Sequence, residues 1–215
     1  MPIKIHGPAR AICTKRVTLV LEEKQVPYEL VLKNCDTLEA RRHPDFLKLQ
    51  PWGKVPVLED DGVFIFESRA ICKYIAKKYA AQGSKLVPDD ADLVGYGLFE
   101  QACSIENNYF NDPAENLAYE VYFKSHLGRG AADDARVQEL ATKLDKALAV
   151  YDTILGRQKY LAGDEISLAD LFHLPYGNLV RTLGYKETFE KYPNVEKWFA
   201  ELAARESWVK ISSAA

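Results

Sequence analysis

The strongest constraint on the fold is a change of pattern near residue 90 of a chain of 215 residues. Up to residue 80, short apolar runs typical of strands alternate with helical spacing, and beyond residue 93 only helical spacing continues. The polar stretch between them contains glycine, proline and aspartate, which is typical of a linker. The sequence therefore predicts an α/β domain over residues 1–81, a linker over 82–92 and an all-helical domain over 93–215.

The first domain begins with a strand, a helix and a second strand. Residues 2–7 alternate apolar and polar side chains and end at Gly-Pro, and helical spacing from about Thr14 ends at Pro27. Residues 28–32 form the next apolar run. Because a β-α-β unit of this size is a common building block, we expect these segments to pack as one.

A hairpin and a helix complete the first domain. Asp60-Asp61-Gly62 separates two apolar runs, and Asp-Gly at this place is a strong hairpin signal. The polar residues 33–50 precede this hairpin without a clear pattern. Ser68 is the expected N-cap of the helix that follows. The order βαβββα predicts a thioredoxin-like domain.

The second domain contains several amphipathic helices. Helical spacing covers 93–110, and apolar residues recur every three or four positions over 137–155. Ser167 and Asp170 predict a capping box at the start of a further helix. Residues 195–205 predict the last helix. We therefore expect an all-α domain.

Charge and composition exclude several classes of function. The formal net charge is −3, so the chain as a whole does not attract nucleic-acid phosphates. No apolar run approaches the roughly 20 residues that span a membrane, and no signal peptide is evident, so a cytoplasmic location is expected. The cysteines (Cys13, Cys35, Cys72, Cys103) and histidines (His6, His43, His126, His173) lack metal-ligand spacing, so no metal is expected.

Two segments carry a family resemblance. The first is Gln50-Pro-Trp-Gly-Lys-Val-Pro-Val-Leu-Glu-Asp60, followed by Phe66-Glu-Ser-Arg-Ala-Ile71. It resembles the glutathione-binding signature of the glutathione S-transferases. The second, Lys159-Tyr-Leu-Ala-Gly-Asp164 with Ile166-Ser-Leu-Ala-Asp170, resembles the folding motif of their helical domain. Residues 66–75 and 122–125 are similar to the phi class of plants and fungi.

This resemblance implies a glutathione site, and the physical chemistry agrees. An extended peptide binds an exposed strand edge through unpaired backbone groups, which Val55 before Pro56 would offer. The start of a helix suits a carboxylate, so the resemblance places the γ-glutamyl end at Glu67 and Ser68. The glycyl carboxylate would lie near Lys54, Arg41 and Arg42. Taken singly, the same residues fit a turn, a helix cap and a solvated face.

The catalytic position departs from the family. Phi-class members activate the glutathione thiol with a serine just before the first helix, and that position is Ala11 here. Thr14 carries a hydroxyl, although it also fits a helix cap. Cys13, followed by Lys15 and Arg16, fits a reactive thiolate that exchanges with glutathione, but it also fits a small buried residue.

The acceptor site is expected to be apolar and to lie between the domains, as is usual for small ligands. The resemblance and the residue types indicate these candidates: Ile12, Leu38, Tyr109, Phe110, Tyr119, Phe123 and Tyr176. Most aromatic residues at helical spacing belong to a core, so that alternative stays open for each of them. Tyrosines also suit the stacking of flat aromatic ligands.

Three functions are compatible with these features. The first is a glutathione S-transferase that conjugates glutathione, its co-substrate, to hydrophobic electrophiles or reduces peroxides with it. The second is a ligandin-type binder of hydrophobic or aromatic compounds in transit, favoured by Ala11 and the aromatic second half. The third is a thiol transferase that depends on Cys13. The resemblance also implies a homodimer with two-fold symmetry.

Overall fold

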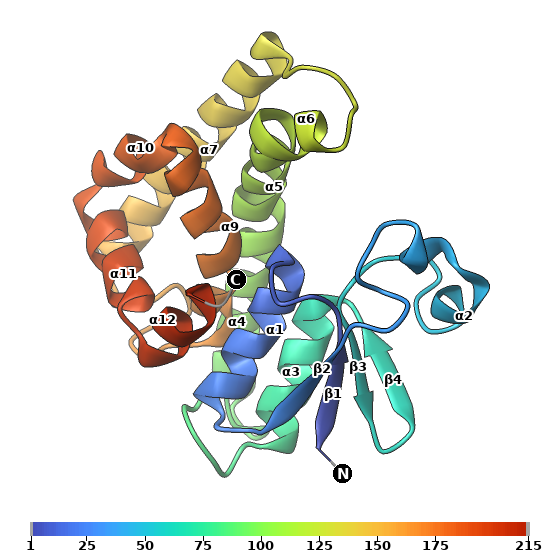
Figure 1. Cartoon of the computed structure of the whole chain (residues 1–215). Coiled ribbons are helices and arrows are strands. Elements are labelled where there is room, and N and C mark those ends of the chain that lie inside the picture. The colour runs from blue at the N-terminus through green and yellow to red at the C-terminus, as the bar shows by residue number, and fades with distance from the viewer. Residues whose placement is uncertain (1, 214–215) are drawn as a thin grey trace. The chain divides into compact units, whose positions relative to one another are not determined.

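A computed structural model describes residues 2–213 of the chain (Figure 1). The chain divides into two compact units, one formed by Met1–Val87 with Arg205–Ala215 and the other by Pro88–Ala204. The sequence had placed residues 205–215 in the helical domain. They group instead with the first unit because a C-terminal helix packs against its first helix.

The first unit contains a four-stranded sheet with the order β2-β1-β3-β4. Strand β1 (Ile3–His6) runs parallel to β2 (Tyr28–Val31) and antiparallel to β3 (Val57–Asp60). Strand β3 forms a hairpin with β4 (Val63–Phe66). The turn residues Asp61 and Gly62 have φ of 47° and 83°, as a type I′ turn requires, and the predicted hairpin is confirmed.

Two helices of the first unit lie side by side, α1 (Ile12–Glu23) and α3 (Ser68–Lys78) (Figure 1). The predicted order of strands and helices is confirmed. Residues 33–50, expected as an unpatterned polar stretch, contain a 3₁₀ turn, η1 (Ala40–Arg42), and a short helix, α2 (Pro44–Leu47). Phe46 of α2 packs with Cys35 and Val57, which anchors this segment on the sheet.

The C-terminal helix α12 (Glu206–Ser212) was not predicted, and a buried carboxylate ties it to the end of α1. Both oxygens of Glu23 accept hydrogen bonds of 2.6 Å from the guanidinium of Arg205. Ser84 Oγ donates to the same carboxylate at 2.6 Å, and Ser207 Oγ donates as well. Burial acts to raise the pKa of Glu23, but these hydrogen bonds outweigh it and the pKa lies below its ordinary value.

The second unit is helical. The predicted helix over 93–110 continues through wide π-helical turns to His126, and the helix over 137–155 is confirmed. The elements are α4 (Leu93–Ile105), η2 (Glu106–Asn111), α5 (Asp112–Ala118), η3 (Tyr119–Phe123), α6 (Lys124–His126), α7 (Asp134–Leu155), α8 (Leu168–Leu171), α9 (Leu174–Val180), η4 (Arg181–Tyr185), α10 (Lys186–Glu190) and α11 (Pro193–Ala203).

The capping box at the start of α8 is confirmed. Asp170 accepts from the backbone N–H and the hydroxyl of Ser167, at 2.9 and 3.0 Å. Its other oxygen accepts from Leu161 N at 3.0 Å and Trp198 Nε1 at 3.1 Å. The carboxyl is fully buried, so these donors replace the water that it loses. The capping box therefore fixes several segments of the helical unit at once.

Candidate functional site

Segments far apart in the sequence meet at one end of the sheet of the first unit. A Cβ atom at Gly7, after β1, would lie 2.7 Å from Thr14 Oγ1 and 3.3 Å from Val55 Cβ. Only glycine therefore allows the loop after β1, the start of α1 and the segment before β3 to approach so closely. The bond between Val55 and Pro56 is cis. Within residues 2–213, the backbone N–H and C=O of Val55 have no hydrogen-bond partner.

The start of α3 joins this region from the other side of Val55. Glu67, not Ser68, is the N-cap, so the expected capping role of Ser68 is wrong. Glu67 has φ of 70°, a conformation that costs a residue with a side chain about 1–3 kcal/mol. Ser68 is the first residue of the helix and is 6% exposed. Its hydroxyl oxygen accepts a hydrogen bond of 2.9 Å from Arg16 Nη1.

Arg41 lies close to the segment before Val55. A Cβ atom at Gly53 would lie 2.9 Å from the carbonyl oxygen of Arg41, and Gly53 has φ of 63°. Arg41 Nε donates to the carbonyl of Cys35 at 2.8 Å, and burial lowers the pKa of its guanidinium. Arg41 and Lys54 therefore come from neighbouring segments. Arg42 lies beside Arg41 in η1 and is exposed.

Gln50 organises this loop and was not among the predicted site residues. Its side chain is 2% exposed, and its Oε1 accepts from Trp52 N at 2.7 Å and from Lys54 N at 3.2 Å. These bonds hold the backbone on which Lys54 and Val55 follow. Its place in the Gln50-Pro-Trp-Gly motif could have indicated a role in the site. The burial of its side chain, however, cannot be recognised from one sequence.

The start of α1 is built differently from the start of α3. Ala11 is its N-cap and no side chain caps the helix. Thr14 is fully buried, and its Oγ1 has no hydrogen-bond partner within residues 2–213. Cys13 is partly exposed, and Arg16 Nη1 lies 3.5 Å from its sulfur. All the cysteines are free thiols.

The proposed acceptor residues have different surroundings. Ile12 and Leu38 belong to the first unit, where Leu38 is 48% exposed. In the second unit, Phe110 is fully buried and packs on His173 with ring centroids 4.5 Å apart. Tyr176 is also buried. Both therefore contribute to the core of the helical unit, which leaves little or no surface for a ligand.

The remaining acceptor candidates lie nearer the surface. Tyr119 and Phe123 are partly exposed in η3, and the hydroxyl of Tyr119 accepts from Arg129 at 3.3 Å. Tyr109 is 63% exposed and lines a cavity of about 610 Å³ within the second unit. The cavity is bounded by Ile105, Asn108, Tyr109, Asp112, Pro113, Lys143, Lys146, Ala147, Val150, Tyr151 and Ile154.

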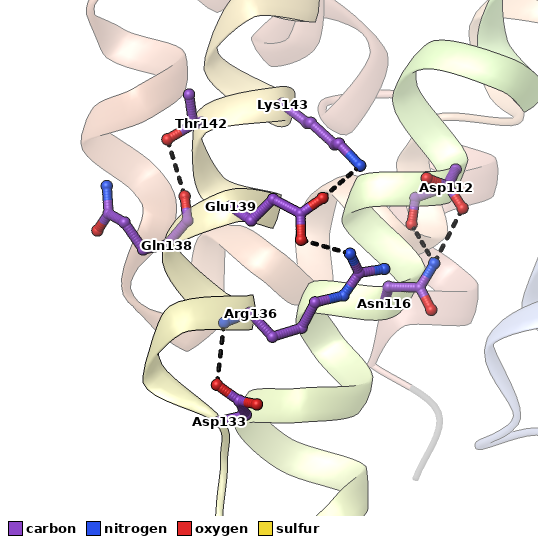
Figure 2. A network of polar contacts seen from close by, with 8 residues as sticks. All are labelled: Asp112, Asn116, Asp133, Arg136, Gln138, Glu139, Thr142 and Lys143. Atoms are coloured by element: carbon purple, nitrogen blue, oxygen red, sulfur yellow. Dashed lines mark hydrogen bonds and ion pairs between the residues drawn. The ribbon is translucent and has the colours of Figure 1, made fainter.

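A polar network flanks one end of this cavity, where α5 and α7 run side by side (Figure 2). Glu139 of α7 accepts from Arg136 and Lys143, both at 2.6 Å. On α5, Asn116 donates to Asp112 at 3.0 Å. Of these residues, Asp112 and Lys143 also line the cavity, so it has charged side chains on both α5 and α7.

The described residues contain neither a metal-ligand cluster nor a membrane-spanning helix. No group of three His, Cys, Asp or Glu side chains in residues 2–213 is arranged to hold a metal ion. No helix in the same range has the length and apolar character to cross a membrane.

The fold is a thioredoxin-like domain, in which the backbone of Val55 is unpaired within residues 2–213, and a helical unit. Comparison with known proteins identifies the family. The model of the glutathione S-transferase N-terminal domain matches residues 1–77, and that of the C-terminal domain matches residues 110–206. The chain belongs to the glutathione S-transferase family.

Known relatives are similar to this protein over almost the whole chain. Glutathione S-transferase hmp2 of Hypomyces subiculosus is 49% identical over 215 residues, covering 100% of both chains. Glutathione S-transferase F11 of Arabidopsis thaliana is 38% identical over 212 residues, covering 98% of this chain and 97% of the relative. Glutathione S-transferase PARB of Nicotiana tabacum is 37% identical over 211 residues, with the same coverage.

Solved structures show the same fold. Glutathione transferase F2 from Populus trichocarpa has a TM-score of 0.90 and 32% identity, covering 98% of this chain and 97% of its own. Maize glutathione S-transferase I, in complex with an atrazine glutathione conjugate, has a TM-score of 0.90 and 32% identity with full coverage of both chains. The resemblance to phi-class transferases is confirmed.

The activity follows from this membership. The protein is a glutathione S-transferase, and glutathione is its co-substrate. The comparisons favour this function over the ligandin and thiol-transferase alternatives. Members of the family bind hydrophobic substrates and typically form dimers.

Proposed function

We propose that glutathione lies extended along Val55, with its two ends held by different segments. The γ-glutamyl carboxylate binds at the start of α3, to the hydroxyl and backbone N–H of Ser68, and Glu67 faces the ammonium group. The glycyl carboxylate binds Arg41, Arg42 and Lys54. The observation that carries this proposal is the unpaired backbone of Val55 between the start of α3 and the Arg41 segment.

The sulfur of glutathione is placed beside the start of α1. The free N–H groups of a helix start favour a thiolate there over a thiol. In conjugation the thiol proton leaves to solvent, and the thiolate then forms the new carbon–sulfur bond as the bond to a leaving group such as halide breaks and the leaving group departs with its electron pair to solvent. Ala11 offers no side-chain donor, so the backbone of α1 and the neighbouring Cys13 and Thr14 are the available groups.

The acceptor is a small hydrophobic electrophile. Ile12 and Leu38 are exposed or partly exposed near the start of α1, and Tyr119 and Phe123 offer aromatic surface on the helical unit. The relative from maize is bound to a conjugate of glutathione with atrazine, an aromatic compound. We infer that flat aromatic electrophiles are the first class to test.

We further propose that the protein acts in the cytoplasm as a homodimer. Several large apolar side chains are exposed in both units, including Trp52 at 68%, Leu93 at 78% and Val94 at 75%. A contiguous exposed apolar patch is typical of an interface, and Leu93 and Val94 are adjacent at the start of α4. Sedimentation equilibrium at several concentrations tests the dimer.

Steady-state turnover and calorimetry test the function. A general aromatic electrophile and glutathione are expected to react faster with the protein than without it, and glutathione is expected to bind at one site per chain. A rate at background with no heat of binding would overturn the proposed site. Ser68→Ala is expected to weaken this binding, and Ser207→Ala, which changes α12, is the matched serine control.

A further inference from the structure

The guanidinium of Arg16 connects the two helix starts that form the glutathione site. Arg16 lies on α1 and is 1% exposed. Its Nη1 lies 2.9 Å from Ser68 Oγ on α3 and 3.5 Å from Cys13 Sγ on α1. We propose that Arg16 is a positioning residue that directs the Ser68 hydroxyl toward the γ-glutamyl carboxylate, a role that rests on the proposed function.

The direction of this hydrogen bond fixes the role of Ser68. A guanidinium has donors but no acceptor, so Ser68 Oγ accepts from Arg16. A hydroxyl hydrogen rotates to suit its partners, and with the oxygen accepting on one side, the hydrogen points elsewhere. Ser68 is thereby prepared to donate to a carboxylate. The rotation of the Ser68 hydroxyl is then already restricted before glutathione binds. Binding therefore loses less conformational entropy, which favours affinity.

The charge of Arg16 acts in the same direction. The side chain is almost completely buried, and an arginine remains charged there. A carboxylate at the start of α3 is attracted by this charge and by the free N–H groups of the helix. Because Nη1 also contacts Cys13, the same group holds the start of α1 at a set distance from Ser68. Arg16 therefore affects glutathione binding more than the later chemical step.

A double-mutant cycle tests whether Arg16 acts through Ser68. Calorimetry with glutathione is done on the wild type, Arg16→Met, Ser68→Ala and the double variant. Each single change is expected to weaken binding about tenfold or more, as for hydrogen bonds to charged groups. Because part of the Arg16 effect passes through Ser68, the double variant is expected to lose clearly less affinity than the product of the two single losses. Losses that multiply in the double variant would show that Arg16 does not act through Ser68.

Thr18→Val is the matched control for damage to α1. Thr18 is 4% exposed on the same helix, and its hydroxyl donates to the carbonyls of Thr14 and Lys15, both at 3.3 Å. The change removes buried hydrogen bonds without touching Ser68. Its glutathione affinity is expected to equal that of the wild type. A tenfold loss in this control as well would assign the Arg16 effect to helix stability and overturn the proposal.

A ligand without the γ-glutamyl carboxylate tests the docking at Ser68 and the role of Arg16 separately. The analogue is 4-aminobutyryl-cysteinylglycine. If the wild type binds it as tightly as glutathione, the proposed docking at Ser68 is wrong. If the wild type prefers glutathione and Arg16→Met keeps that preference, the docking stands and the role of Arg16 is wrong. The expected result is a preference in the wild type that Arg16→Met loses, with KM for glutathione rising more than kcat falls.

Two further measurements apply if Arg16→Met does not fold. Arg16→Lys keeps the positive charge and is expected to retain part of the preference for glutathione over the analogue. In the wild type, the guanidinium nitrogen signals of Arg16 are expected to shift on addition of glutathione and not on addition of the analogue. Equal signals with both ligands would overturn the proposal.

Discussion

The starts of α3 and α8 look alike in sequence, and the structure uses them in opposite ways. Each helix start contains a serine with an acidic residue within three positions of it, Glu67 before Ser68 and Asp170 after Ser167. At α8, Ser167 and Asp170 close the helix start with their own side chains. At α3, Glu67 takes the N-cap with a positive φ, and its side chain makes no capping bond. One helix start is closed by its own side chains, and the other has no side-chain cap.

Whether the serine takes part in a capping box depends on the third residue after it. A capping box needs an acid or amide there, which Asp170 provides at α8. The equivalent residue of α3 is Ile71, which is buried in the core and cannot bond to the backbone. The hydroxyl of Ser68 is instead paired with Arg16 from another helix. The comparison predicts that changes at α8 affect stability and that changes at α3 affect binding.

The largest expected effect is on the closed helix start. Asp170→Ala removes the acceptor of several buried hydrogen bonds and leaves their donors unpaired. We expect the free energy of unfolding to fall by about 3–5 kcal/mol. Urea denaturation measures this loss. Glutathione affinity of the folded fraction is expected to stay unchanged, and a large loss of affinity there would contradict the comparison.

The two ends of helix α1 differ in a similar way. No side chain caps its start, whereas Glu23 near its C-terminal end pairs with Arg205. Glu23→Gln is expected to lower the free energy of unfolding by about 2 kcal/mol, since it weakens a buried ion pair. The pKa of Glu23 is lowered by folding, so its contribution is complete above the ordinary value of 4.5 and is lost as the pH falls through the lowered value.

Urea denaturation at several pH values tests this prediction. The wild type is expected to lose stability in acid more steeply than Glu23→Gln, which has no carboxyl at this place to titrate. Lys210→Gln is the matched control, because Lys210 pairs with the neighbouring Glu22 at the surface. Parallel curves for the wild type and Glu23→Gln would contradict the role of the Glu23 carboxylate.

At the open helix start, the expected effect is on binding. Ser68→Ala is expected to weaken glutathione binding between tenfold and a hundredfold, through the loss of a hydrogen bond to a charged carboxylate. Ser167→Ala is the counterpart at α8 and is expected to lower stability by about 1 kcal/mol with no change of affinity. Calorimetry and urea denaturation on both variants give the result. The same response from both serines would remove the distinction between the two helix starts.

The sequence was sufficient for features that depend on neighbouring residues. The hairpin follows from Asp61-Gly62 between two apolar runs, and the start of α8 follows from Ser167 and Asp170. Features that depend on distant residues were missed. The capping role expected of Ser68 was wrong because the positive φ of Glu67 is held by the surrounding structure. Helix α12 was missed because the partner of Arg205, Glu23, lies at the other end of the chain.

The candidate site shows the same limit. The glutathione-binding residues were named from a motif, and the structure brings the start of α1, Val55 and Ser68 together around Gly7 and Arg16. Gln50 and Arg16 were missed as site residues because a buried polar group is indistinguishable from an exposed one in a single sequence. Phe110 was named for the acceptor site, since helical spacing does not separate a core ring from a pocket ring.

The smallest expected effect concerns the start of α1, where the family's hydroxyl is missing. Ala11→Ser adds a donor at the N-cap, which has none at present. A hydrogen bond from this hydroxyl stabilises the thiolate of bound glutathione. The apparent pKa in the pH profile of kcat/KM for the electrophile, measured at saturating glutathione, is therefore expected to fall by about one unit, equivalent to about 1.4 kcal/mol. Ala9→Ser adds the same hydroxyl elsewhere in the loop and is expected to leave the profile unchanged. An unchanged profile in Ala11→Ser would mean that the sulfur does not lie beside the N-cap of α1, and Cys13 would then be the next residue to vary.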